Sequence, residues 1–412
     1  MKVFRSAIQS IRHNRLRPVL AGFGIAWGIF LLVFFLGVGG GFRDGVMKMF
    51  NAFAQKSLFV YGGQTSVATV EMNNDTQIVF DRDIVDRIGQ RYGSVASYSV
   101  EMTSPALILS WEGETSSASI KGVDADYFVI RLLDIKAGRG ISRMDDLKER
   151  NVAVIGEGIK KALFQNQDPI GKMVDAEGNL FRIIGVLSSE DLFTMQERNS
   201  VYVPASSFVN SFNSEGKISS FCVSLSSDAN TSDIEDDLKG WLAWECGFDA
   251  HDEQAIYVSN IEAQTSAFES LFHGLEVLIW IVGICLLLSG IVGVCNVMLI
   301  IVQERTSEIG IRKAVGATSG SIISMILAES VIITFIAGII GIVLGVLVVL
   351  LANKIVLPML HTDIMDDLQI NVPAMVAAFV VLCLSGISAG LFPALKASQI
   401  SPVDAIRYEN RG

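Results

Sequence analysis

Charged side chains that could recognise another molecule are concentrated in the short segment 303–317 (QERTSEIGIRKAVGA). They are Glu304, Arg305, Glu308, Arg312 and Lys313. Ile309, Ile311 and Val315 are interspersed at helical spacing, and Gly316 can end a helix by adopting the left-handed conformation. A helix this short is marginal in isolation, so we expect it to dock against a partner. The competing interpretation is an ordinary basic cytoplasmic loop, which has a similar composition.

Motifs for enzymatic chemistry are missing from the sequence. It contains no GxxxxGK[ST] phosphate loop, no HExxH and no close cysteine pair with zinc spacing. Gly156 and Gly158 (IGEG) lack the third glycine of a dinucleotide loop, so a strand-to-helix turn explains them. A group of potential metal ligands is better explained as a solvated loop after a helix. Its members are Glu245, Cys246, His251, Asp252 and Glu253. The sequence therefore predicts a non-catalytic chain that binds no metal or cofactor.

Glu329 is an ionisable residue deep within a long apolar run. A carboxylate inside a membrane is a functional-site hypothesis by default. The alternative is a hydrogen-bonded residue that faces neighbouring helices and only orders their packing. The sequence does not separate these two interpretations.

Long uncharged runs position these residues. Runs of more than about 18 apolar residues predict membrane-spanning helices, and we place four of them at 18–42, 273–302, 321–352 and 373–395. The first is too long for a signal peptide and has no cleavage site after it. Glycines four residues apart occur in three of the four and predict close helix packing. They are Gly24 and Gly28, Gly341 and Gly345, and Gly386 and Gly390.

Charge distribution predicts the topology. The chain carries a net charge of −11, yet residues 1–17 contain five basic and no acidic residues. Basic segments stay in the cytoplasm. We therefore expect an amphipathic cytoplasmic helix at 1–17 that contacts membrane lipid. We also expect a cytoplasmic loop at 303–320, a short external loop at 353–372 and a cytoplasmic tail at 396–412. An acidic bulk outside the membrane disfavours nucleic-acid binding.

The region 43–272 has the pattern of an extracytoplasmic α+β domain. Strand-like runs at 57–63, 104–111, 151–156 and 220–227 alternate with helical patterns at 82–91, 157–164 and 231–246. Residues 175–179 (DAEGN) predict a hairpin turn. Cys222 and Cys246 could pair here, although two unpaired thiols are the more common state. Cys285, Cys295 and Cys383 fall within the apolar spans, where a thiol behaves as a small hydrophobe.

No helix breaker separates the end of this domain from the second span. Residues 259–302 predict one continuous helix of about 65 Å at 1.5 Å per residue. That is about twice the 30 Å hydrocarbon core of a bilayer, so part of the helix should project outward as a stalk.

Several of these motifs resemble one family. The string ERTSEIGIRKAVGA resembles the coupling loop of FtsX/MacB-type ABC-transporter permeases. The order KGVDADYF, IKAGRGIS, NVAVIGEGIKKALF, DPIGKMV and FRIIGVL is similar to the MacB-type periplasmic core domain, and ALKASQISPVDAIRYE to the family's C-terminal pattern. The matching coupling positions are Glu304, Arg305, Glu308, Ile309, Gly310, Ile311, Arg312, Lys313, Ala314, Gly316 and Ala317.

The resemblance implies a membrane α-helical fold of four transmembrane helices, with a large extracytoplasmic α+β domain between helices 1 and 2. It implies a multi-pass permease of the cell inner membrane with both termini cytoplasmic. The permease would dimerise with itself or a related permease. A separate cytoplasmic ATPase would bind ATP and Mg and act through the coupling loop. Motion of the external domain would then expel substrate from the periplasmic side, with a periplasmic adaptor and outer-membrane channel as further partners.

Three alternatives remain at this point. A lipoprotein-releasing transporter would have apolar clefts between the first and second spans. A signalling module of the FtsX type would activate a cell-wall hydrolase, but its external domain is usually much smaller. An anchored receptor without transport would leave the coupling motif unexplained.

Overall fold

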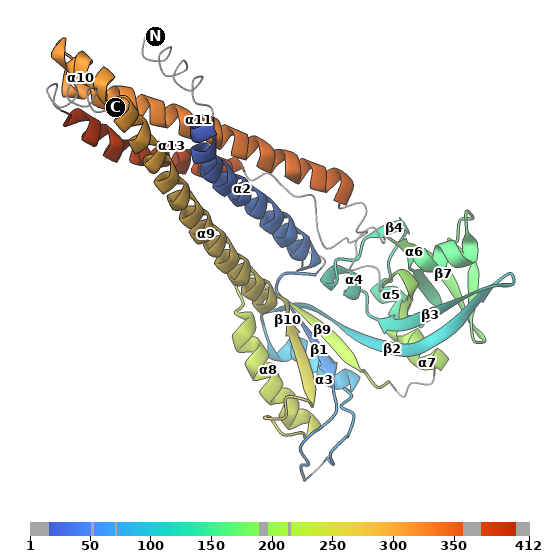
Figure 1. Ribbon diagram of the computed structural model, residues 1–412. Coiled ribbons are helices and arrows are strands. Elements are labelled where there is room, and N and C mark those ends of the chain that lie inside the picture. Colours follow the sequence, from blue (N-terminus) through green and yellow to red (C-terminus); the bar gives the residue numbers. More distant parts are fainter. Residues whose placement is uncertain are drawn as a thin grey trace. The chain divides into compact units, whose positions relative to one another are not determined.

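The computed structural model describes residues 16–50, 53–70, 72–188, 197–212, 216–356 and 372–400. The chain divides into two compact units, which are considered separately (Figure 1). One combines Met1–Gly45 with Ser270–Gly412, and the other is Val46–Glu269. Most of the predicted amphipathic helix at 1–17 and most of the predicted segments 353–372 and 396–412 lie outside the described residues.

The first unit is helical. Its long helices are α2 (Leu16–Phe50), α9 (Ile261–Glu304), α11 (Ser319–Leu351) and α13 (Val372–Ser398), with the short α10 (Thr306–Ala314) and a π-helical turn η4 (Ala352–Val356). Within the described residues, four helices are long and apolar enough to cross a membrane. Together with the α+β unit between the first and second, they confirm the predicted fold class. The 44-residue α9 is unbroken, which gives about 66 Å at 1.5 Å per residue.

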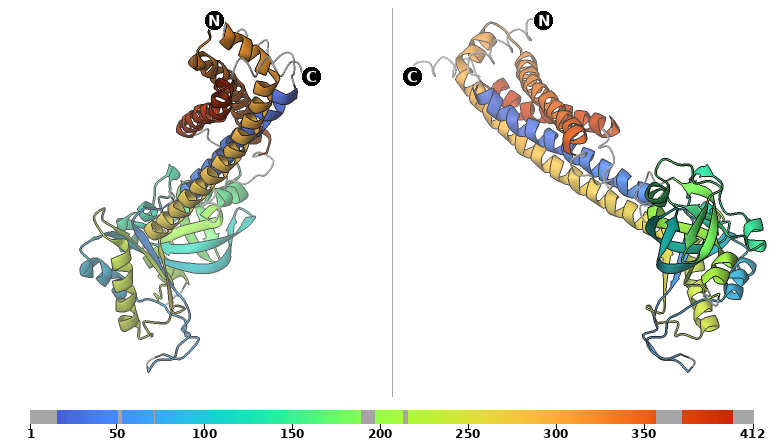
Figure 2. Two further views of the ribbon diagram at one scale, coloured as in Figure 1. Left: turned by 60° about the vertical axis from the view of Figure 1, so that its left-hand side comes forward. Right: turned by 90° about the vertical axis from the view of Figure 1, so that its right-hand side faces the viewer.

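Small residues bring the four long helices close together. Helices α2 and α9 run side by side in both views of Figure 2. A Cβ atom added to Gly24 would lie 3.3 Å from the Cα of Gly290, and one added to Gly341 would lie 2.4 Å from the carbonyl oxygen of Ala26. Gly28, Gly345, Gly386 and Gly390 likewise face neighbouring helices, at 2.7–3.3 Å from such an atom. The six glycines therefore permit close approach within the chain, as expected of small-xxx-small spacing.

The second unit is built on one mixed ten-stranded sheet. Its strand order is β10-β1-β9-β2-β3-β8-β5-β7-β4, and β6 pairs with β2 and β7. The strands are β1 (Ser57–Gly62), β2 (Val95–Trp111), β3 (Glu114–Val123), β4 (Ile135–Gly138), β5 (Val152–Ile155), β6 (Met173–Ala176), β7 (Asn179–Leu187), β8 (Ser200–Pro204), β9 (Ser220–Leu225) and β10 (Ile256–Asn260). Central strands β5 and β8 are buried on both faces, which is why they are continuous apolar runs.

Two lobes share the sheet through the long strand β2, which pairs with β9 of one lobe and β3 of the other. The first lobe contains β1, β9 and β10 with α3 (Arg82–Arg91) and α8 (Thr231–Cys246) (Figure 1). The inserted lobe contains β3 to β8 with its own short helices. These are α4 (Tyr127–Ile130), α5 (Arg143–Leu147), α6 (Glu157–Ile159), η1 (Lys160–Phe164), η3 (Glu197–Asn199) and α7 (Ala205–Phe212).

Several local predictions match the structure of this unit. Helices form at 82–91 and 231–246, and the helix predicted at 157–164 is a short α-helical turn followed by a π-helical one. The hairpin turn between β6 and β7 has Glu177 at φ 51° and Gly178 at φ 93°, the two positive values that a type I′ turn requires. All five cysteines are free thiols, so Cys222 and Cys246 form no disulfide. Burial raises the pKa of Cys246 to about 11, which keeps its thiol protonated.

Candidate functional site: the coupling segment

The segment predicted to contact a partner is a short helix between two long ones. Helix α9 ends at Glu304, Arg305 follows it, and α10 runs from Thr306 to Ala314. Gly316 then adopts φ 102°, a left-handed conformation open to glycine. The Thr318 hydroxyl accepts a hydrogen bond from the Ser321 amide and caps α11. The backbone thus reverses between α9 and α11 with α10 at the turn (Figure 1).

One side of α10 is buried in the helical bundle. Ile309 is 2% exposed and belongs to the same apolar core as Val302, Ile322 and Ile326. Ile309 is one of the positions that match the coupling pattern, and its side chain is already covered by this chain.

An ion pair ties the start of the coupling segment to α11. Arg305 Nη1 lies 3.3 Å from Glu329 Oε2 and donates a hydrogen bond to it. Glu329 is 4% exposed, whereas the Arg305 side chain is about one third exposed. The buried carboxylate therefore faces a neighbouring segment, as the packing interpretation expected. The segment that it holds is the candidate coupling site itself.

A second attachment fixes the end of α10. Lys313 Nζ donates hydrogen bonds to the carbonyl oxygens of Ser398 and Ile400, the latter at 2.9 Å, at the end of α13. These carbonyls need donors because they lie at the C-terminal end of a helix. Lys313 is another position that matches the coupling pattern, and its ammonium group is hydrogen-bonded within the chain.

The other side of α10 is exposed and combines apolar with charged groups. Ile311 is 56% exposed and Val315 is 85% exposed. Arg312 lies between them; its guanidinium is 2.6 Å from Glu308 and also contacts the sulfur of Met325 at 2.9 Å. We call Glu308, Ile311, Arg312 and Val315 the coupling face. Exposed Glu304, Gly316 and the half-buried Ala317 flank it.

Other residues singled out in the sequence have structural roles in the α+β unit. A Cβ atom on Gly156 would lie 2.3 Å from the carbonyl oxygen of Glu197, so this glycine lets the β5–α6 turn pack against η3. The carboxylate of Glu245 pairs with Arg87 at 2.6 Å, and that of Asp252 accepts hydrogen bonds from Ser66. Among the described residues, no group of three His, Cys, Asp or Glu side chains is arranged to hold a metal.

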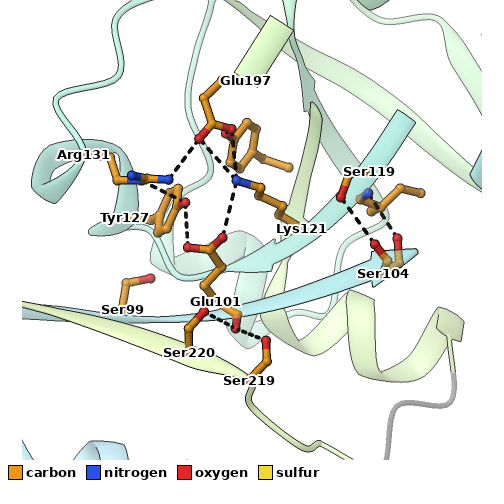
Figure 3. Close-up of polar contacts among 12 residues, drawn as sticks. Ser99, Glu101, Ser104, Ser119, Lys121, Tyr127, Arg131, Glu197, Ser219 and Ser220 are labelled. Atoms are coloured by element: carbon orange, nitrogen blue, oxygen red, sulfur yellow. Dashed lines mark hydrogen bonds and ion pairs between the residues drawn. The ribbon is translucent and has the colours of Figure 1, made fainter. Parts of the chain in front are cut away.

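A buried ionic cluster in the α+β unit has no local signal in the sequence (Figure 3). Its members, here called the ionic cluster, are Glu101, Lys121, Tyr127, Arg131, Glu197 and Tyr202. Glu197 accepts from Arg131 at 3.0 Å, from Lys121 at 3.1 Å and from the Tyr202 hydroxyl. Glu101 lies 3.4 Å from Lys121 and accepts from the Tyr127 hydroxyl at 2.9 Å.

Electrostatics keep the Glu197 carboxylate charged and the two phenols neutral. Burial favours the neutral form of Glu197, but Lys121, Arg131 and the Tyr202 hydroxyl outweigh it and lower its pKa. Burial raises the pKa of Tyr127 and Tyr202 well above the usual value for a phenol, so both remain donors. The two glutamates and the two cations balance in charge.

The helical unit also has an apolar groove of about 270 Å³ between α2 and α9. It is lined by Leu31, Leu32, Phe35, Leu278, Ile279, Val282, Gly283 and Leu286. Nothing in the structure shows what covers it.

Comparison with known proteins matches both units. Residues 19–240 match the MacB-like periplasmic core domain, and residues 280–402 match the FtsX-like permease C-terminal region. The macrolide export ATP-binding/permease protein MacB of Neisseria meningitidis is 28% identical over 99% of this chain and 61% of its own length. That of Bdellovibrio bacteriovorus is 27% identical over 97% of this chain and 61% of its own. The chain thus spans about 61% of the length of these relatives.

Two solved structures match about half of this chain. The periplasmic region of MacB from Actinobacillus actinomycetemcomitans is 23% identical, with a TM-score of 0.44, and the match covers 53% of this chain and 95% of that one. The extracellular domain of YknZ, an ABC-type transporter of Gram-positive bacteria, is 18% identical with a TM-score of 0.41, covering 50% of this chain and 100% of that one. With four apolar helices and both family matches, the chain is a multi-pass membrane protein that belongs to the MacB-like family of ABC-transporter permeases.

Proposed function

We propose that this chain is the permease subunit of an efflux transporter of the inner membrane, driven by a separate cytoplasmic ATPase. The sequence contains no phosphate-binding loop motif, and both matched family regions are permease regions. In this proposal the permease pairs with a second copy or a related permease. A periplasmic adaptor and an outer-membrane channel would complete the export path. Because its relatives are named macrolide export proteins, a macrolide is the first substrate to test.

The coupling face carries the proposal. Ile311 and Val315 expose apolar side chains on a helix whose opposite side is held in the bundle by Ile309 and Lys313. Arginine is enriched among the residues that dominate binding energy at interfaces, and Arg312 lies here between two exposed apolar side chains. We therefore assign the coupling face as the contact with the ATPase.

Movement of the ATPase would enter the chain by two attachments. The Arg305–Glu329 ion pair passes displacement of α10 to α11, and Lys313 passes it to α13. Helix α9 needs no attachment, because it continues without a break from Glu304 to Ile261, the residue after β10. In this mechanism the helix is the lever that moves the periplasmic domain and pushes substrate outward.

The test is the double substitution Ile311→Asp and Val315→Asp. Both side chains are exposed, so the protein should reach the membrane in normal amounts, while copurification of the ATPase and transport should be lost. The matched control is Leu147→Asp, an equally exposed aliphatic residue on α5 of the α+β unit. It should change neither property. A double variant that still binds its ATPase and transports normally contradicts the proposal.

A further inference from the structure

Arg131 lies where the chain leaves α2 and enters the α+β unit. The end of α2, Val46–Phe50, belongs to that unit, and the Ala54 amide donates a hydrogen bond to the Ile130 carbonyl at 3.0 Å. The Arg131 guanidinium carbon is 5.1 Å from the ring centre of Phe53 and 5.3 Å from that of Phe59 on β1. One face of this cation is thus held by the segment directly after α2 and by the first lobe.

The hydrogen bonds of the Arg131 guanidinium are made to residues of the inserted lobe. Arg131 donates to Glu197 on η3 and, through Nε, to the Tyr127 hydroxyl on α4 at 3.1 Å. Figure 3 shows Glu197 also meeting Lys121 of β3, whose ammonium group reaches Glu101 of β2. The ionic cluster therefore joins the α2 exit to strands of both lobes.

Supporting residues fix the inner end of this connection. Gly156 and Gly158 bring the β5–α6 turn against the backbone of η3, where any side chain would collide with the carbonyl oxygen of Arg198. A Cβ atom would lie 2.3 Å from that oxygen at Gly156 and 2.8 Å at Gly158. Glu197 is thus carried on a backbone that the inserted lobe holds closely. Close packing against η3 therefore explains why glycines occupy both positions of the IGEG sequence, without a phosphate-binding role.

The physics of such a cluster favours one geometry. Charges in a low-dielectric interior are tolerated only when paired and hydrogen-bonded, so a shift of one partner leaves another charge buried and unpaired. Apolar contacts would tolerate small sliding, because the hydrophobic effect is not directional. Charge-assisted bonds from a planar guanidinium restrict both distance and direction.

We propose that Arg131 is a positioning residue that locks the end of α2 to both lobes, so that the α+β unit moves as one body when α9 displaces it. The part concerning displacement rests on the proposed function. The lock itself does not, since it concerns the stiffness of one unit without any ATPase.

The lock is tested in the full chain by measuring the distance between the lobes. Spin labels at Asp236→Cys on α8 and Lys161→Cys on η1, both exposed, report this distance in a background without the five native cysteines. The parent should give a narrow distance distribution. The charge-balanced double variant Arg131→Met with Glu197→Gln should give a clearly broader one, and Arg131→Lys an intermediate one.

The matched control is Asp145→Asn. It breaks a buried ion pair with Arg139 (2.6 Å) and Arg150 (3.2 Å) that lies wholly within the inserted lobe. It should lower thermal stability but leave the distance distribution as narrow as in the parent. A double variant as narrow as the parent overturns the proposal, and so does a control that broadens as much as the double variant.

A second measurement uses the complex with the ATPase in proteoliposomes. The double variant should keep its ATP hydrolysis rate while macrolide transported per ATP falls several-fold, because movement delivered by α9 is lost between the two lobes. Equal transport in parent and double variant overturns the role of Arg131 and leaves the proposed function standing. A parent that shows no ATP-driven transport contradicts the proposed function, while the distance measurement still decides the lock.

Discussion

The Arg305–Glu329 ion pair gives a quantitative prediction. At a separation of 3.3 Å and an effective dielectric of about 20, two unit charges attract by about 5 kcal/mol. Part of this is offset, because burying Glu329 costs solvation and the one-third-exposed Arg305 can rehydrate when its partner is removed. A hydrogen bond to a charged group contributes a net ~1.5–3 kcal/mol. We therefore expect Glu329→Leu to destabilise the helical unit by about 2 kcal/mol.

The assay is thermal denaturation of the detergent-purified chain, arranged as a double-mutant cycle. Arg305→Met, Glu329→Leu and the two together should give an interaction free energy of about 2 kcal/mol. Glu329→Gln should lie between the parent and Glu329→Leu, because its amide still accepts a hydrogen bond. Transport should fall in both single variants, since α10 is no longer held to α11.

The control is Glu276→Leu, which removes an exposed carboxylate from α9 and should leave stability unchanged. A Glu329→Leu variant as stable as the parent, together with an interaction free energy near zero in the cycle, would contradict the prediction. The Glu329 carboxylate would then add no stability through its ion pair with Arg305.

Three further outcomes follow from the structure. Gly341→Ala should destabilise the bundle by about 1–3 kcal/mol, because its Cβ would meet the Ala26 carbonyl oxygen. A Cβ atom at Gly293 would meet no other atom within 4 Å, so Gly293→Ala should be neutral or slightly stabilising in the same denaturation assay. Burial of Asp252 favours the neutral acid, but hydrogen bonds from Ser66, Val67 and Gln254 outweigh it and lower the pKa to about 2. The Asp252 carboxylate therefore contributes to the free energy of unfolding above its unfolded pKa of about 3.9, and this contribution is lost as the pH falls to about 2. The difference in melting temperature between the parent and Asp252→Asn should shrink over that range. Finally, a membrane-impermeant thiol reagent applied to whole cells should label Leu147→Cys and not Val315→Cys in a cysteine-free background; labelling of position 315 would contradict the proposed topology.

The sequence was sufficient for features that depend on local composition and period. Apolar length alone predicts four spans, and helical or strand-like patterns predict α3, α8 and the strands β1, β2, β5 and β9, because each element's buried face repeats within its own segment. The turn at Glu177–Gly178 was equally predictable, since its backbone requires two positive φ values.

The tertiary structure decided which of several similar residues faces which way. Ile309 and Ile311 are two residues apart with the same side chain, yet the first is buried and the second is exposed. Helical periodicity defines opposite sides of α10 but not which side meets α9, α11 and α13. The inward direction of Lys313 likewise depends on where α13 ends, 85 residues further along the chain.

For the same reason, the sequence could not predict which distant charged residues form ion pairs. Glu329 meets an arginine 24 residues before it, and Glu197 meets Lys121 across 76 residues. In the sequence, each of these charged residues by itself looks like a solvated surface charge or like a buried charge without a partner. Only strand register and helix contact bring them within bonding distance, because those are set by the whole core and not by any local segment.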